Sequence, residues 1–99
     1  MRKVTIKGVE YKLAYNLRSL FIYEEIAGQP YKGEKTIDNY VLMFAMLQAN
    51  NEGFDMTFDE FIAACDEDLG IFMEFVEVVE AYSKRVASYA DNKKKAMMP

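Results

Sequence analysis

Apolar and polar residues alternate along the first fourteen positions of the chain, a period of two that is typical of strands. The large apolar residues in this stretch are Val4, Ile6, Val9, Tyr11 and Leu13. A two-residue turn at Lys7-Gly8 would pair Ile6 with Val9 and Val4 with Tyr11, so that all of them fall on one face. The pattern therefore predicts a β-hairpin over residues 3–14, and its apolar face needs helices to pack against because an isolated hairpin is marginal.

Four helices are expected after the hairpin, over residues 17–27, 37–49, 58–65 and 69–90. Each begins after a residue whose side chain can accept a hydrogen bond from the first helical turn. These N-cap candidates are Asn16, Thr36, Thr57 (with Glu60 completing a capping box), and Asp66 or Asp68. Gly28 suits the end of the first helix. We expect an α+β fold that is mostly helical, with one globular domain over residues 1–90 and a flexible basic tail over residues 91–99.

Two of the expected helices have more apolar surface than one small core needs. Residues 40–47 are apolar without interruption, and the stripes on the helix over 69–90 together span about half of its circumference. Such surface is either covered by the other helices or left free to bind a partner helix or a second copy of the chain. If it is left free, the side chains that contact the partner are predicted to be Met43, Met46, Leu47, Phe72, Phe75, Val79 and Tyr82.

Charge is strongly segregated along these 99 residues, although the net charge is only −4. Residues 1–35 carry a net +3, residues 36–83 hold eleven acids and no base, and residues 84–99 carry a net +4. An acidic helical body repels phosphate, which argues against nucleic acid as a partner. The acids either form a solvated face that keeps the domain soluble or attract a basic partner protein.

The residue types that carry most enzyme chemistry are missing. The chain has no histidine, and Cys65 is its only cysteine, flanked by acids that disfavour a reactive thiolate. Residues 50–61 resemble a calcium loop between two helices, but no register places the required acids and glycine correctly. No glycine-rich phosphate loop is present. We therefore expect no enzymatic activity, no metal and no cofactor.

The location of the protein is predicted from three features of the sequence. The longest apolar run, residues 40–47, is too short to span a membrane, and the N-terminus leads directly into strand residues without a secretory signal. A single cysteine cannot form an intrachain disulfide, which suits a reducing compartment. These observations predict a protein of the cytoplasm that does not interact with membranes.

The order of elements resembles that of the tail assembly chaperones of long-tailed bacteriophages. The resemblance covers residues 3–90: a hairpin of the form Lys3–Leu13, an Asn-capped helix that ends in Glu24–Gly28, an apolar helix, the helix start Met56–Phe61, an acidic step at Asp66–Asp68, and a last amphipathic helix. It consists of elements and caps, without a catalytic signature. The family has no catalytic or metal residues that could be transferred to this sequence.

The resemblance implies that the chain binds the tape measure protein, a long helical partner, and keeps it soluble until tail tube subunits polymerise around it. The alternative is another small phage or bacterial interaction protein, such as a head–tail connector component or a regulator. The sequence leaves open whether the chain forms a homo-oligomer. Members of the family are often made in two lengths by a translational slip, so Lys93–Lys95 are either encoded by a slippery run of adenines or form an ordinary basic tail.

Overall fold

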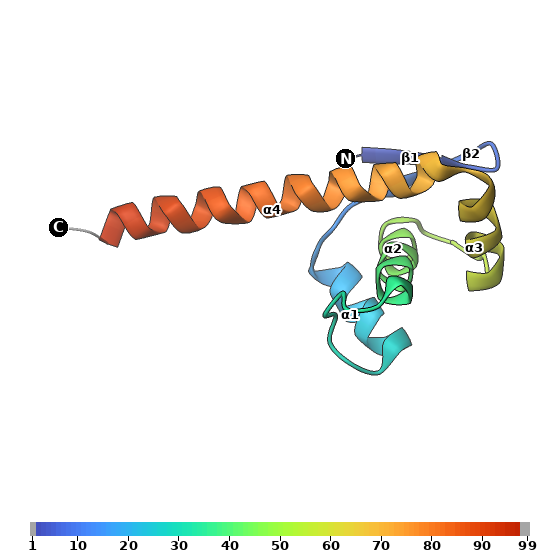
Figure 1. Cartoon of the computed structure of the whole chain (residues 1–99), viewed down its shortest axis with the longest axis horizontal. Coiled ribbons are helices and arrows are strands. Elements are labelled where there is room, and N and C mark those ends of the chain that lie inside the picture. Colours follow the sequence, from blue (N-terminus) through green and yellow to red (C-terminus); the bar gives the residue numbers. More distant parts are fainter. Residues whose placement is uncertain (1, 98–99) are drawn as a thin grey trace.

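The hairpin and the helices follow one another in the predicted order. The computed structural model describes the backbone of residues 2–97 and the side chains of residues 2–91. Within that part of the chain, two antiparallel strands precede four helices, which confirms the predicted α+β fold (Figure 1). The elements are β1 (Arg2–Ile6), β2 (Val9–Leu13), α1 (Leu17–Ala27), α2 (Thr36–Asn50), α3 (Phe58–Glu67) and α4 (Leu69–Met97).

The hairpin turns at Lys7-Gly8, as its sequence predicts. Both turn residues have positive φ angles, 52° and 79°, the combination that matches the twist of a two-residue hairpin. Ile6 pairs with Val9, and Val4 pairs with Tyr11. The apolar face points into the molecule at Val4, Ile6 and Leu13, which are buried. Val9 shares that face but is exposed, because it lies next to the turn at the rim of the core.

Other parts of the chain lie along both edges of this small sheet, which hinders pairing of those edges with other chains. On the β2 side, the amide of Asn51 behaves like a neighbouring strand. Its Oδ1 accepts the Lys12 backbone N–H at 2.8 Å, and its Nδ2 donates to the Lys12 carbonyl at 2.9 Å. On the other side, β1 lies along α4.

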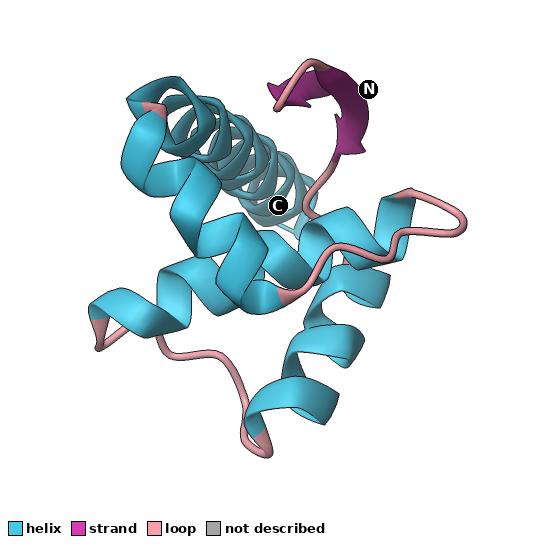
Figure 2. Ribbon diagram, turned by 90° about the vertical axis from the view of Figure 1, so that its right-hand side faces the viewer, coloured by secondary structure: helices cyan, strands magenta, loops and turns pink. Residues whose placement is uncertain are grey.

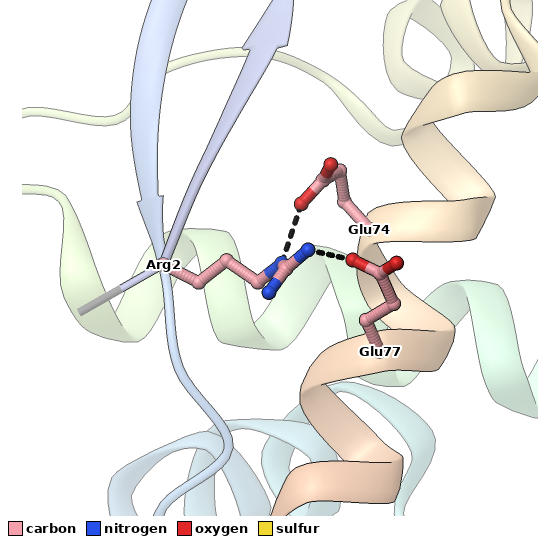
Figure 3. A network of polar contacts seen from close by, with 3 residues as sticks. All are labelled: Arg2, Glu74 and Glu77. Carbon is pink, nitrogen blue, oxygen red and sulfur yellow. Dashed lines mark hydrogen bonds and ion pairs between the residues drawn. The ribbon is translucent and has the colours of Figure 1, made fainter.

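Arg2 ties β1 to α4 through two carboxylates (Figure 3). Its Nε donates to Glu74 at 2.6 Å, and its guanidinium also pairs with Glu77, one helical turn further along α4. All three side chains are about a third to half exposed. Since exposed ion pairs contribute about 0.2–1 kcal/mol, this contact positions α4 more than it stabilises the fold.

The first helix begins and ends at the residues that its sequence indicates. The Asn16 side chain accepts the Ser19 N–H at 2.9 Å, and Gly28, with φ of 73°, donates its N–H to the Glu24 carbonyl at 2.8 Å. Ser19 is completely buried, and its hydroxyl donates to the Ala14 carbonyl at 3.1 Å. The N-terminus of α1 is thereby anchored to the end of the hairpin.

The core is centred on α2, which α1, α3 and the hairpin surround (Figure 2). Residues 42–47 are all buried, which explains why this stretch is apolar on every side. The prediction that Thr36 is the N-cap is wrong: Thr36 is the first helical residue and Lys35 is the N-cap. The Asp38 carboxylate accepts the Lys35 backbone N–H at 3.1 Å, so the first turn starts one residue earlier.

The last two helices follow each other with almost no linker. Thr57 Oγ1 accepts the Glu60 N–H at 3.1 Å at the start of α3, and Asp68 Oδ1 accepts the Gly70 N–H at 2.9 Å at the start of α4. α3 extends two residues past the predicted end at Cys65. α4 continues seven residues past Ala90, so residues 91–97, predicted to be a flexible tail, are helical. The side chains of Lys93–Lys95 lie outside the described residues.

The length of α4 determines the shape of the molecule. With 29 residues it is about 43 Å long, whereas the two shorter dimensions of the molecule are 28 and 25 Å. The C-terminal half of α4 therefore extends away from the other helices (Figure 1), and the longest dimension reaches 54 Å. The radius of gyration is 15.2 Å, against about 13 Å for an ordinary domain of this size. None of the helices in residues 2–97 is both long and apolar enough to cross a membrane.

Candidate protein-binding surface

The structure separates the seven predicted contact residues into two groups. Met43, Met46 and Leu47 are completely buried on α2, and Phe75 on α4 is 5% exposed. These four side chains hold α2 and α4 in the core, so they do not reach a partner while the fold is intact. Phe72 and Val79 are partly exposed at the edge of the core, and Tyr82 is partly exposed beside Tyr15. The α4 residues differ in exposure because one face of α4 packs on β1 and α3.

A different set of large apolar side chains is free at the surface. Those at least about half exposed are Val9, Leu17, Phe21, Ile26, Ile37, Leu69, Met73, Val86 and Tyr89. Leu17 and Phe21 lie one turn apart on α1 and are 66% and 58% exposed. Tyr89, on the extended part of α4, is 69% exposed. Single exposed apolar residues are ordinary, but exposed residues that line a common groove indicate a binding surface.

Such a groove joins the start of α1 to the extended part of α4. It has a volume of about 410 Å³ and is lined by Tyr15, Asn16, Leu17, Tyr82, Arg85, Val86 and Tyr89. A neighbouring hollow of about 680 Å³ shares Asn16 and Leu17 with it and continues to Phe21 and to the end of α2. We call Leu17, Phe21, Tyr82, Val86 and Tyr89 together the α1/α4 surface.

Tyr82 marks the place where α4 leaves the body. Its ring packs on that of Tyr15, with 4.5 Å between the centroids, and the Arg85 guanidinium lies 5.8 Å from the Tyr82 ring. Burial, together with the nearby Tyr31 and Tyr82, raises the pKa of Tyr15. All described side chains of α4 beyond Tyr82, from residue 83 to residue 91, are exposed.

Leu17 and Phe21 were not among the residues predicted from the sequence, although a signal for them exists. They are spaced i, i+4 and therefore lie on one face of α1. Tyr23, which is buried, lies on another face of the same helix. Apolar residues on two faces of α1 already indicate more apolar surface than the core uses. Val86 and Tyr89 belong to the predicted stripes of α4, but only the structure shows that they lie beyond the body.

Cys65 is partly buried on α3, next to acidic residues. Burial, with Asp66 and Asp68 nearby, raises the pKa of the Cys65 thiol to about 11, so the thiolate is scarce at neutral pH. In the described part of the chain, no group of three or more acids or cysteines is placed to hold a metal ion.

Comparison with protein-family models, with curated proteins and with solved structures finds no match to this chain.

Proposed function

We propose that this chain is a non-enzymatic protein-binding module and that its α1/α4 surface receives an apolar helical segment of a partner. The observation that carries the proposal is the groove in which Leu17 from α1 faces Val86 and Tyr89 from α4. A groove between two helices, lined by apolar side chains one turn apart, fits the helix-in-groove mode of recognition, in which an amphipathic partner helix places its apolar stripe between them.

The extended end of α4 supports the proposal energetically. The helix runs on to Met97, and its side chains from residue 83 to residue 91, the last that are described, are all exposed. Helices of about 12–15 residues are marginal in water when nothing packs against them. A partner that covers Val86 and Tyr89 would therefore stabilise this end of α4 and would lie between it and α1.

The resemblance of the sequence to phage tail assembly chaperones suggests what the partner is. A tape measure protein offers long helical segments with apolar stripes. A chaperone would cover these stripes until tail tube subunits polymerise around the tape measure protein. A chaperone for such a chain needs exposed apolar surface to bind it, and it needs charge to remain dispersed. The α1/α4 surface meets the first need, and the eleven acids of residues 36–83 meet the second.

Co-expression tests the proposal. The chain is produced together with the product of the longest neighbouring open reading frame, which is the candidate tape measure protein. We expect that product to become soluble and to co-purify with the wild-type chain. A double variant, Leu17→Asp with Val86→Asp, should lose it, because two charges enter the groove while the core stays intact.

A matched control separates the groove from exposed apolar residues in general. Val9→Asp with Ile26→Asp introduces the same charges at exposed apolar positions outside the α1/α4 surface, and it should retain the partner. Loss of the partner in both variants, or retention in both, would contradict the proposed surface. A folded partner of another kind, such as a connector component, in place of the long helical protein would contradict the chaperone assignment.

A further inference from the structure

A second apolar groove lies between the start of α2 and α3. α3 lies at the end of the molecule opposite to the extended end of α4 (Figure 1). The volume of the groove is about 570 Å³, and its apolar lining comes from Ile37, Tyr40, Phe58 and Ile62. Ile37 is 56% exposed. Tyr40 stacks on Phe72 of α4 with 5.6 Å between the ring centroids, which fixes one wall of the groove.

The groove is bordered by acids and has no basic residue in its lining. Asp59 and Asp66 line it, and both are exposed. They are seven residues apart on α3, so they lie on one face, about 10 Å or two turns from each other. Beside them, Phe58, Ile62 and Cys65 form an apolar row on the same helix. The nearest base in the sequence is Lys35, just before α2. Residues 36–83 contain no lysine or arginine.

This combination defines the chemistry of an occupant. An apolar channel excludes a purely polar chain, and an acidic border disfavours acidic partners, since like charges facing each other across an interface are costly. An amphipathic helix with an apolar stripe and flanking lysines or arginines satisfies both conditions. Basic residues seven positions apart on such a helix match the spacing of Asp59 and Asp66.

We infer that the groove between α2 and α3 binds a lysine- or arginine-rich amphipathic helix of another protein. The apolar stripe of that helix packs on Ile37, Tyr40 and Ile62, and its basic residues pair with Asp59 and Asp66. This site is separate from the α1/α4 surface, so it does not depend on the proposed function.

A model peptide tests this inference. The probe is a fluorescein-labelled 18-residue amphipathic helix of leucine and lysine, and a leucine–glutamate peptide of the same pattern is the control. Fluorescence anisotropy at about 50 mM salt should show binding of the lysine peptide only. Raising the salt to about 300 mM should weaken binding, because the charged contacts are at the surface.

Two double variants that remove the same charge separate a specific site from general attraction. Asp59→Asn with Asp66→Asn should weaken binding by threefold or more, since each exposed ion pair contributes modestly. Glu52→Gln with Asp91→Asn changes exposed acids beyond the far end of α2 and on the extended part of α4, and it should bind within twofold of wild type. Ile37→Ser should also weaken binding, and it provides the test if the aspartate variant does not fold.

Cys65 lies in the groove and reports directly on its occupancy. With the thiol pKa at about 11, alkylation by excess iodoacetamide at pH 9 is slow but measurable by mass spectrometry. Saturating lysine peptide should slow this alkylation several-fold. An unchanged alkylation rate, or equal weakening by both double variants, would overturn the inference. It would also be overturned if the protein alone forms oligomers that the aspartate variant dissociates, because the occupant would then be a second copy of the chain.

Discussion

Phe75 and Phe21 are the same residue type on two helices, but their surroundings are opposite. Phe75 is 5% exposed and belongs to the core, whereas Phe21 is 58% exposed and belongs to the α1/α4 surface. Phe75→Ala should lower the free energy of unfolding by about 3–5 kcal/mol, because it removes a buried ring and leaves a cavity. Phe21→Ala should change it by less than about 0.5 kcal/mol.

Urea unfolding followed by circular dichroism measures both effects. Phe75→Ala should lose far more free energy of unfolding than Phe21→Ala, although both variants remove the same atoms. Equal losses of stability would show that Phe21 is part of the core and would remove it from the binding surface. A small loss for Phe75→Ala would show that α4 does not pack on the body as described.

Several side chains hold their protons more tightly in the folded state. Burial raises the pKa of Tyr23, with a further contribution from Asp38, and burial similarly raises that of Tyr31. The Cys65 thiol is raised from its usual 9.0 to about 11. Because the unfolded chain loses these protons at lower pH than the folded chain, the contribution of Cys65 is complete below about pH 9 and is lost as pH rises towards 11. The contribution of the two tyrosines is complete below about pH 10 and is lost as pH rises further.

The urea midpoint should therefore fall between pH 9 and pH 10.5. Between pH 7 and pH 8.5 these groups should cause little change in the midpoint. Cys65→Ser should make the fall shallower, since it removes one of the contributing groups. A midpoint that stays constant up to pH 10.5 would contradict the assigned burial of these side chains.

Local residue roles were predictable because they depend on neighbours in sequence. Asn16, Thr57 and Gly28 act at the helix ends where their residue types predict. The burial of Met43 and Phe75, which were predicted to contact a partner, was not predictable. A buried and an exposed apolar residue cannot be distinguished within an apolar stripe of the sequence. Which side of a stripe faces the core is decided by packing between elements far apart in sequence, here α4 against β1.

Among the elements, α4 combines two roles. Its first half belongs to the body through Ile71, Phe75 and Val78, and its second half has only exposed side chains up to residue 91. A chain that ends after Ser83 should therefore retain its melting temperature within about 2 °C. It should lose helical circular dichroism in proportion to the residues removed.

Thermal unfolding of the shortened chain checks this prediction, with the full-length chain as reference. A drop of 10 °C or more would show that the second half of α4 packs on the body, which would contradict its availability to a partner. The same shortened chain should no longer capture the partner, because Val86 and Tyr89 are gone.

The C-terminal end of α4 shows what periodicity misses. Residues 91–97 have no apolar period, so a tail was predicted there, yet lysine, alanine and methionine all have high helix propensity. High helix propensity favours continuation of the helix once α4 has been nucleated by its packed half. Helices with a strong apolar face, such as α1 and α2, were predicted to within one or two residues.

At the scale of the whole molecule, the two grooves lie at different ends and differ in charge. The α1/α4 groove includes Arg85, with Arg18 in the hollow beside it, whereas the groove between α2 and α3 is bordered by aspartates. The segregation of charge was visible in the sequence, but its assignment to two surfaces was not. That assignment depends on the direction in which α4 leaves the body (Figure 1).

The central claim is that a partner helix binds between α1 and the extended part of α4. Hydrogen exchange of backbone amides, followed by mass spectrometry on the free chain and on the complex with the co-expressed partner, tests it most directly. In the free chain, amides of residues 83–91 should exchange rapidly, because no packing protects this part of α4. In the complex, residues 17–21 and 82–91 should become protected together. Protection confined to other segments, with residues 83–91 still exchanging at the free rate, would contradict the account.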